Sequence, residues 1–339
     1  MQWSDTLKPL SQGGDLTRDQ TYQAMTEIMA GRATPAQIAA FIVAIRIKGE
    51  TTEELTGLVE AMREASVRVT VDRPVLDIVG TGGDGFGTFN ISTTAAFIAA
   101  GAGCTVAKHG NRSASSKCGS ADVLEALGVV IDLDPAATVQ LIEEHGFGFF
   151  YARTYHPAMR HAGPVRSELG IPTVFNFLGP LTNPATAEHL ALGVADGTMA
   201  ERMIGVLANL GAARAFAFHG DDGLDELSTT GPSTIYELRN GTIERSTFDP
   251  ADHGLAPAKL DDLVGGDVAD NVVILRRVLA GEPGPQRDIA VLNAAAGIAA
   301  AGRAESIAEA IPTAEASIDS GAAAQVLERV VRASQDVGG

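Results

Sequence analysis

Hydrophobic and polar positions follow two different patterns along the chain, and the change falls near residue 70. Before it, three hydroxyl residues each stand three positions ahead of a Gln or Glu and open an apolar segment of helical period. Each pair is a capping box, in which the two side chains satisfy backbone N–H groups of the first helical turn. The pairs are Thr17 with Gln20, Thr34 with Gln37, and Thr51 with Glu54. Residues 1–70 are therefore predicted to form an all-helical lobe.

From residue 75 onward, short apolar runs alternate with segments of helical length. Such alternation predicts an α/β lobe over residues 71–339, with a central, mostly parallel sheet flanked by helices. A helix is expected over 135–145, because Asp134 is a good cap and Pro follows it. Asn240-Gly241 predicts an antiparallel hairpin, and the last 60 or so residues return to helix. The strand-like runs cover 75–79, 104–107, 129–133, 148–151, 190–194, 213–218, 234–238 and 242–248.

Composition narrows the class of protein. The net charge of −17 argues against sequence-independent binding to nucleic acid, which calls for a basic face. No apolar run approaches the length of a membrane span, and the N-terminus lacks a signal-type apolar core. Cys104 and Cys118 form no recognisable disulfide or metal pattern. We therefore expect a cytoplasmic protein with reduced thiols, and neither nucleic acid nor membrane as a partner.

Glycines from Gly80 to Gly85 follow the first predicted strand and precede a predicted helix. Strand, glycine loop and helix N-terminus together form an arrangement that binds phosphate. The glycine spacing also fits a dinucleotide site, but that site needs an acidic residue about 20 positions further on. Lys108 stands there instead, and no Gly-Lys-Ser/Thr marks a P-loop. Asp84 inside the loop needs a metal or a sugar hydroxyl beside the phosphates.

A second polar segment follows the next predicted strand. It carries three cations among several serines, which suits a ligand with more than one phosphate, because each phosphate oxygen favours a charge-assisted donor. A solvated surface loop is the alternative interpretation. The position at the carboxyl end of a strand favours a ligand site. The residues concerned are Lys108, Arg112, Lys117, Ser113, Ser115, Ser116 and Ser120.

Four long motifs resemble the anthranilate phosphoribosyltransferase family. They are GTGGDGFGTFNIST (80–93), KHGNRSASSKCGSADVLEALG (108–128), HPAMRHAGPVRSELGIPTVFNFLGPLTNP (156–184) and HGDDGLDELS (219–228). The resemblance implies transfer of the 5-phosphoribosyl group from phosphoribosyl pyrophosphate to the amino group of anthranilate in tryptophan biosynthesis, with Mg2+ and release of pyrophosphate. It also implies a homodimer formed through the helical lobe, which a later segment at about 170–185 completes.

Site residues can be carried over from the family to matching positions. The resemblance gives Lys108 and Asn111 catalytic roles. The implied phosphoribosyl pyrophosphate site comprises Gly80, Gly82, Gly83, Asp84, Thr88, Asn90, Ile91, Ser92, Thr93, Lys108, His109, Gly110, Asn111, Arg112, Ser113, Ala114, Ser115, Ser116 and Ser120. The implied anthranilate site comprises Gly80, Asn111, Arg166, His109 and Pro180, and the metal ligands are Ser92, Asp225 and Glu226.

Neighbouring residues receive a structural interpretation. Asp221 and Asp222 are expected to be solvated loop acids, whereas the next two acids suit Mg2+, which prefers hard oxygen ligands. Tyr155, His156 and Met159 are weaker candidates for the acceptor pocket and are compatible with packing. His156 and His161 are five residues apart, which does not put both on one helix face, so a metal pair is disfavoured.

The expected mechanism is a dissociative displacement at the ribose C1 with inversion and without a covalent intermediate. An aromatic amine is neutral near pH 7, so alignment and charge stabilisation of the leaving pyrophosphate are the main demands. Three alternatives stay open at this stage. They are a pyrimidine nucleoside phosphorylase, a non-enzymatic relative that binds nucleic acid, and phosphoribosyl transfer to another acceptor.

Overall fold

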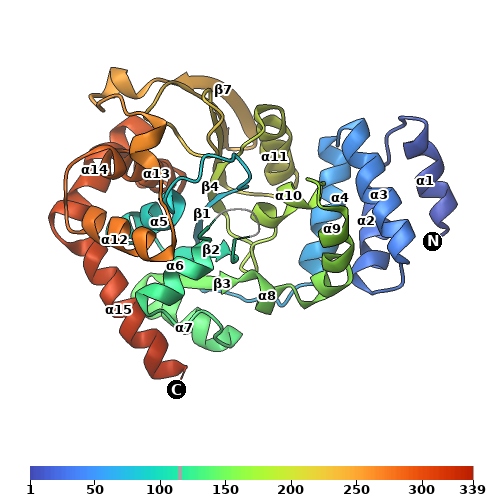
Figure 1. Cartoon of the computed structure of the whole chain (residues 1–339), viewed down its shortest axis with the longest axis horizontal. Coiled ribbons are helices and arrows are strands. Elements are labelled where there is room, and N and C mark those ends of the chain that lie inside the picture. The colour runs from blue at the N-terminus through green and yellow to red at the C-terminus, as the bar shows by residue number, and fades with distance from the viewer. Residues whose placement is uncertain (114–116, 339) are drawn as a thin grey trace.

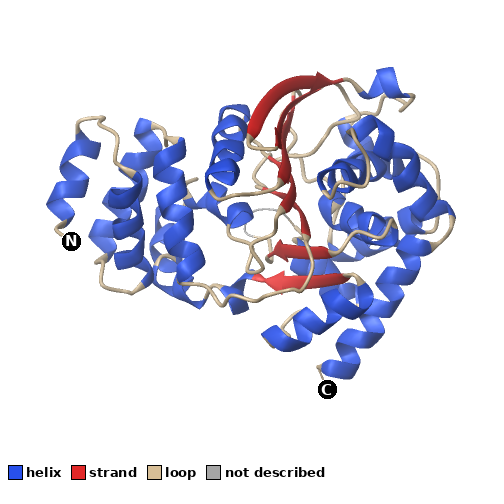
Figure 2. Ribbon diagram, turned by 180° about the vertical axis from the view of Figure 1, so that it is seen from behind, coloured by secondary structure: helices blue, strands red, loops and turns tan. Residues whose placement is uncertain are grey.

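The computed structural model describes residues 1–113 and 117–338. A small helical lobe lies beside a larger α/β lobe, and the two are seen from opposite sides in Figures 1 and 2. This confirms the predicted fold class. The N-terminal helices are α1 (Trp3–Ser11), α2 (Arg18–Met29), α3 (Pro35–Lys48) and α4 (Thr52–Glu64).

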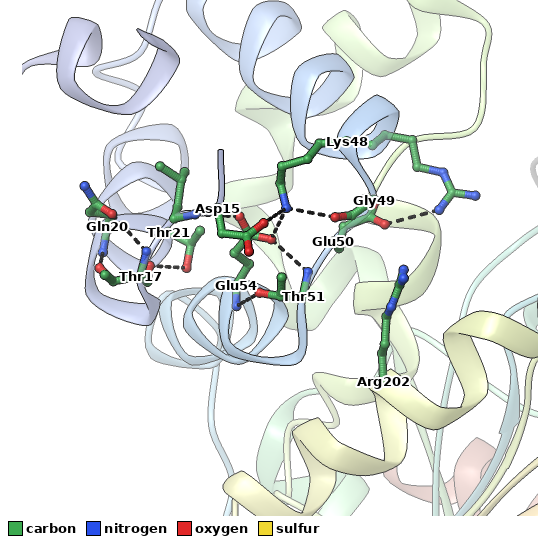
Figure 3. Close-up of polar contacts among 12 residues, drawn as sticks. Asp15, Thr17, Gln20, Thr21, Lys48, Gly49, Glu50, Thr51, Glu54 and Arg202 are labelled. Atoms are coloured by element: carbon green, nitrogen blue, oxygen red, sulfur yellow. Dashed lines mark hydrogen bonds and ion pairs between the residues drawn. The ribbon is translucent and has the colours of Figure 1, made fainter. Parts of the chain in front are cut away.

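All three predicted capping boxes are present at the starts of α2, α3 and α4. In each, the threonine hydroxyl accepts a hydrogen bond from the backbone N–H three residues on, and the Gln or Glu side chain accepts one from the threonine N–H. The boxes of α2 and α4 appear in Figure 3. Gly31 and Gly49, which follow α2 and α3, both adopt positive φ, at 69° and 87°. These glycines therefore let the chain leave each helix.

A buried ion-pair network joins the segments around these caps (Figure 3). The Lys48 ammonium donates to Glu54 at 2.8 Å, to Asp15 at 2.7 Å and to the Gly49 carbonyl at 2.8 Å. Glu54 is fully buried and also accepts the Leu16 N–H at 2.8 Å. A buried carboxylate is tolerated only when it is paired in this way. The network therefore fixes the α1–α2 connection onto the turn between α3 and α4.

A seven-stranded sheet forms the centre of the larger lobe. Its order is β3-β2-β1-β4-β5-β6-β7; the first five strands run parallel, and β6 and β7 are antiparallel. Asn240 and Gly241 both have positive φ in the β6–β7 turn, so the predicted hairpin is confirmed. The strands are β1 (Leu76–Gly80), β2 (Val106–Gly110), β3 (Phe147–Tyr151), β4 (His189–Gly193), β5 (Arg214–Gly220), β6 (Ser233–Arg239) and β7 (Thr242–Phe248).

One predicted strand is wrong. Residues 129–133 form neither a helix nor a strand, and they pair with no strand in the part of the chain that the structure describes. They leave α6 (Ser120–Leu127) through the left-handed Gly128, and the Val130 N–H donates to the Ser334 hydroxyl of α15 (Ala322–Val337) at 3.0 Å. Val129, Ile131 and Leu133 are buried. The alternation of apolar residues indicates only that one face of the segment is buried. This segment buries that face without joining the sheet.

Helices rich in small residues cover the sheet. Ala and Gly in α5 and α13 allow close approach, since a Cβ on Gly297 would lie 2.5 Å from Cδ1 of Ile78 in β1. The predicted Asp134 cap of α7 is confirmed, because its side chain accepts the Ala137 N–H. None of the described helices is long and apolar enough to cross a membrane. The helices are α5 (Ile91–Gly101), α7 (Pro135–His145), α11 (Gly197–Asn209), α12 (Val268–Leu279), α13 (Pro285–Ala300) and α14 (Ile307–Asp319).

The chain between β3 and β4 returns to the helical lobe. There, α9 lies against α3 and α10 against α4 (Figure 1). The contacts begin before residue 170, since a Cβ on Gly31 would lie 2.6 Å from the His161 ring. The exact extent of the helical lobe stays a prediction. The segment comprises α8 (Ala152–Tyr155), η1 (Pro157–His161), α9 (Gly163–Leu169), α10 (Phe175–Leu178) and η2 (Gly179–Leu181).

Gly57→Ala tests the packing of α2 on α4. A Cβ at Gly57 would lie 2.1 Å from the carbonyl oxygen of Arg18, so one helix must shift. We expect the free energy of unfolding to fall by about 1–3 kcal/mol, as for other overpacked sites. Urea denaturation followed by circular dichroism measures it. Gly231→Ala is the control, because no atom lies within 4 Å of its added Cβ. Equal stability of the two variants would contradict the packing described here.

Candidate active site

The carboxyl ends of β1, β2, β4 and β5 bring together the loops that carry the predicted site residues. Gly80 of β1 lies in register with Gly193 of β4, which in turn is paired with Phe218 of β5. Ligands of open α/β sheets bind at this edge, where parallel strands release their loops. The predicted residues after β1, β2 and β5 therefore share one region of the molecule.

Asp225 and Glu226 are seated against the glycine loop. The Gly82 N–H donates to Asp225 at 2.6 Å, and the Ser92 N–H at the start of α5 donates to Glu226 at 3.1 Å. Both acids are more than nine-tenths buried. A Cβ on Gly80 would lie 2.3 Å from the Asp225 carboxylate. The first glycine of the motif is therefore required for close approach of the acidic loop.

Gly193 is a second glycine that this loop needs, and sequence reasoning missed it. A Cβ at this position would lie 1.7 Å from the Asp225 carbonyl oxygen. The signal in the sequence was a glycine interrupting the apolar run 190–194. Such an interruption marks a strand where another backbone approaches closely.

Three acids concentrate negative charge at this edge. Burial, with the charge of Asp84 next in importance, raises the pKa of Asp225 to about 7. Burial and the charge of Asp225 raise the pKa of Glu226 well above its usual range. One carboxylate oxygen of Asp84 is buried and has no hydrogen-bond partner among the described residues. A hard cation bound here would stabilise the negative charge of all three acids.

The donor set fits Mg2+ rather than a metal held by protein ligands alone. Within the described ranges, no group of three or more His, Cys, Asp or Glu side chains surrounds a single point closely enough to chelate an ion. Mg2+ usually takes one or two carboxylates and completes its shell with water and substrate phosphates. The two acids and the neighbouring Ser92 are compatible with that arrangement.

Lys108 is buried between the two strands that carry the polar loops. Its ammonium donates to the Ile78 carbonyl at 2.5 Å and to the Ser92 hydroxyl at 3.3 Å. Burial lowers its pKa, while the charges of Asp77 and Glu226 oppose that change. The side chain is 1% exposed. Lys108 is therefore a buried hydrogen-bond donor fixed at the base of the site.

Asp77 and Asn183 form a buried pair that sequence reasoning also missed. Asp77 accepts the His109 N–H at 3.2 Å and the Asn183 side-chain amide at 2.8 Å. The same amide donates to the Ala107 carbonyl at 2.8 Å. Burial raises the pKa of Asp77 to about 6. An acid inside the apolar run 75–79 was the available signal, since buried carboxylates need specific partners.

Two neutral histidines lie beside this pair. The His109 Nδ1 is 3.2 Å from the Gly179 carbonyl oxygen, so that nitrogen is assigned the proton, and the buried Nε2 has no partner. Burial lowers the pKa of His109 to about 3 and that of His156 to about 4. The two rings are 5.0 Å apart. The structure thus places His156, a weaker sequence candidate for the acceptor pocket, beside a predicted site residue.

Arg166 lies half-buried on α9 and forms no ion pair in the described part of the chain. Its guanidinium lies 5.1 Å from the centre of the Phe175 ring, and burial lowers its pKa. Pro180 is buried in η2, next to the Gly179 carbonyl that faces His109. An unpaired guanidinium with a planar fork is suited to a carboxylate.

The loop after β2 is held by its own ion pairs. Arg112 contacts Asp122 at 3.0 Å and Glu125 at 2.8 Å, so its guanidinium is engaged with α6. The carbonyl of the exposed Asn111 accepts the Ser120 hydroxyl. The Ser113 N–H donates to Asp122. Predicted residues Ala114, Ser115 and Ser116 lie outside the described residues. Phosphate binding by this loop stays a prediction.

Asn90 connects the two polar loops. Its side-chain amide donates to the Cys118 carbonyl at 3.3 Å, and its backbone N–H donates to Asn271 of α12 at 3.0 Å. Thr88 forms an isolated bridge with Val264, and Ile91 and Thr93 are buried at the start of α5. Within residues 1–113 and 117–338, the buried Thr93 hydroxyl has no hydrogen-bond partner. Asn90 therefore holds in place the loop region that carries Lys117 and Cys118.

Residues interpreted as structural have identifiable contacts. Asp222 accepts the Leu224 N–H and the Ser228 hydroxyl within its own loop, and Asp221 is exposed. Tyr155 packs edge-on against Phe150 at 4.8 Å. Asp221 and Tyr155 agree with the structural interpretation. Asp222 is not a solvated acid, because it is partly buried and its carboxylate organises its own loop.

Comparison with known proteins identifies the family. The helical-bundle domain of the glycosyl transferase family matches residues 4–66, and its a/b domain matches residues 72–324. The anthranilate phosphoribosyltransferase of Roseiflexus castenholzii is 53% identical over 332 residues, which cover 97% of this chain and 98% of that protein. The chain belongs to the anthranilate phosphoribosyltransferase family.

Solved structures of family members share the whole fold. The anthranilate phosphoribosyltransferase of Thermus thermophilus superposes with a TM-score of 0.93 at 45% identity, covering 98% of this chain and 99% of that one. The enzyme of Saccharomyces cerevisiae, in complex with PRPP (phosphoribosyl pyrophosphate) and Mg, gives 0.90 at 28% identity, covering 98% of each chain. Membership decides against the pyrimidine nucleoside phosphorylase and the non-enzymatic nucleic-acid binder.

Gly193→Ala tests whether close approach at β4 positions the acidic pair. The added Cβ has no room beside the Asp225 backbone, so the loop must move away from Gly80. We expect turnover to fall about 100-fold or more, because ångström-scale misplacement of catalytic groups has effects of that size. Steady-state kinetics measures it, with Gly231→Ala as control. Near-wild-type turnover of Gly193→Ala would show that the approach is unimportant.

Asn183→Ala tests the buried amide. Removing it leaves oxygens of Asp77 and Ala107 unpaired, at a cost of about 1–3 kcal/mol in stability. Because the pair also holds His109, we expect the KM for the acceptor to rise more than the KM for the phosphoribosyl donor. Both constants are compared with those of Asn209→Ala, an exposed site. An equal rise in both constants would oppose a role on the acceptor side.

Proposed function

We propose that this chain transfers the 5-phosphoribosyl group from phosphoribosyl pyrophosphate to the amino group of anthranilate, in the tryptophan biosynthetic pathway. The observation that carries the proposal is the convergence of Lys108, the glycine loop and the pair Asp225–Glu226 at one sheet edge. Relatives support it, since yeast structures contain PRPP and Mg, or 4-fluoroanthranilate.

The donor side is assigned to the glycine loop and the loop after β2. Backbone N–H groups at Gly82 and Gly83, where φ is positive, suit pyrophosphate oxygens. Lys108 supplies a fixed positive charge beside them. Bound Mg2+, held by Ser92, Asp225 and Glu226, would neutralise charge on the pyrophosphate. The other donor-site residues are Gly80, Asp84, Thr88, Asn90, Ile91, Thr93, His109, Gly110, Asn111, Arg112, Ser113, Ala114, Ser115, Ser116 and Ser120.

The acceptor side is assigned to Arg166, His109, Asn111, Gly80 and Pro180. Arg166 has no carboxylate partner within the described residues and would bind the anthranilate carboxylate through its planar fork. The neutral His109 ring, with Nε2 unpartnered, can accept a hydrogen bond from an amine. His109 can therefore bind the amine group of anthranilate in its neutral form, without gaining or losing a proton.

Chemistry at this site requires alignment rather than a protein nucleophile. The C1–O bond to pyrophosphate breaks, its electron pair leaves with the pyrophosphate, the amine nitrogen forms a bond to C1 on the opposite face, and the amine then loses one proton to solvent. We propose a dissociative path with inversion and no covalent intermediate. Lys108 stabilises the departing oxygens, because a preorganised charge in a buried site is strongly effective. Asn111 would hold the acceptor near C1.

We also propose a cytoplasmic homodimer formed through the helical lobe. Ile47 on α3 is 80% exposed, and few large apolar side chains among the described residues are as accessible. The two-lobed division at residue 70, with completion by about 170–185, belongs to the same proposal. Contacts of α9 and α10 with α3 and α4 support it.

One assay tests the proposed function. Anthranilate is fluorescent, so its consumption can be followed continuously with the purified chain. We expect fluorescence to fall only when phosphoribosyl pyrophosphate and Mg2+ are both present, with one pyrophosphate released per anthranilate consumed. No fluorescence loss under these conditions, combined with turnover of another amine, would move the assignment to a different acceptor.

Arg166→Ala tests the acceptor assignment. The variant lacks the proposed carboxylate partner, so the KM for anthranilate should rise about 10- to 100-fold, equivalent to about 1.4–2.8 kcal/mol. The KM for phosphoribosyl pyrophosphate should change less than twofold, because the contact involves only the acceptor. Steady-state kinetics with each substrate varied measures both. Arg73→Ala, at an exposed site, is the control. An equal rise in the KM for anthranilate and in the KM for phosphoribosyl pyrophosphate would contradict the assignment.

A further inference from the structure

A polar pocket of about 680 Å³ lies away from the proposed active site. It lies between the two lobes. Its wall is formed by residues of α2, α4 and the following linker, together with two residues of the α/β lobe. The lining comprises Arg18, Asp19, Tyr22, Glu60, Arg63, Glu64, Arg68, Thr186 and Leu210.

The acids of this pocket already have partners. Arg18 binds Glu60 through two hydrogen bonds, of 2.8 and 2.6 Å. The Tyr22 hydroxyl donates to Glu64, and Asp19 accepts the side-chain amide of Gln23. Glu60 is therefore paired with a cation, whereas Asp19 and Glu64 are hydrogen-bonded to neutral groups.

Arg63 and Arg68 lack such partners. Each uses its Nε for a backbone carbonyl, that of Leu181 for Arg63 and that of Arg63 for Arg68, both at 2.9 Å. Within the described ranges, neither guanidinium forms an ion pair. Burial, with the charge of Arg68 beside it, lowers the pKa of Arg63 to about 10. Two guanidiniums thus stand together with no carboxylate of the described residues within ion-pair distance, and the charge of Glu60 acts on Arg63 only from further away.

We propose that this pocket binds a small molecule through a phosphate or carboxylate group held by Arg63 and Arg68. Adjacent guanidiniums repel each other, and an oxyanion between them removes that repulsion while accepting charge-assisted hydrogen bonds. Their free Nη groups suit the planar or tetrahedral oxygens of such a group. The Tyr22 ring and Leu210 provide a wall for the body of the ligand.

The pocket is connected to the proposed acceptor side by one hydrogen bond. The Leu181 carbonyl that Arg63 binds lies in η2 with Gly179 and Pro180, and the Gly179 carbonyl faces His109. An anion that reorients Arg63 therefore acts on the segment that carries Pro180. This effect on acceptor binding rests on the proposed function, whereas anion binding does not.

Calorimetric titration tests the pocket without any turnover. Inorganic phosphate and succinate are titrated separately into the full chain as wild type, Arg68→Gln and Arg73→Gln. Both variants lose one positive charge from an exposed side chain, but only Arg68 lines the pocket. We expect at least one anion to bind wild type and Arg73→Gln at one more site per chain than Arg68→Gln.

The anion that shows this difference identifies the recognised group. Phosphate bound at the active site does not affect the difference in the number of sites, because the active site is the same in all three proteins. Equal binding of both anions to all three proteins would overturn the proposal. In kinetics, that anion should change the KM for anthranilate at least twofold in wild type and Arg73→Gln but not in Arg68→Gln. An inactive chain that still shows the binding difference would refute only the proposed function.

Discussion

Burial of Asp225 and Glu226 against the glycine loop is the constraint on which the active-site region depends. Two carboxylates taken out of water are costly unless hydrogen bonds and cations compensate them. Here backbone N–H groups of Gly82 and Ser92 hold them, and Lys108 contributes a nearby charge. The pKa of both acids is nevertheless raised, so a bound cation would stabilise their ionised forms. In the proposed function, a metal–pyrophosphate ligand would supply the cation.

The sheet makes this burial possible. Gly80 and Gly193, in register at the ends of β1 and β4, leave room for the backbone and carboxylate of Asp225. The same strand ends place Asp77 and Lys108 in the layer beneath the site, where Asp77 also fixes His109 and Asn183. The proposed donor and acceptor sides thus share one buried polar layer, in which Lys108 lies on the donor side and His109, held by Asp77, lies on the acceptor side.

The fold class and most local elements could be predicted from the sequence, because capping boxes, the Asn240-Gly241 turn and apolar strands are governed by nearby residues. The error at residues 129–133 arose because alternation reports a buried face and not a strand partner. Gly193 and Asn183 could not be assigned, since their importance comes from atoms distant in sequence: the Asp225 carbonyl for one and Asp77 for the other. Site roles came mainly from family motifs; the structure brings together residues that follow β1, β2 and β5, and the roles themselves stay predictions.

The most direct test of this account is the dependence of phosphoribosyl pyrophosphate binding on Mg2+, measured by isothermal titration of the substrate into the metal-free chain and into the chain with Mg2+. The buried acids should oppose the polyanion when no cation is present. We therefore predict binding at least about 100-fold weaker without Mg2+, equivalent to about 2.8 kcal/mol. The same comparison with Asp225→Asn/Glu226→Gln should show a much smaller dependence. Equal affinity of the wild-type chain with and without Mg2+ would contradict the account.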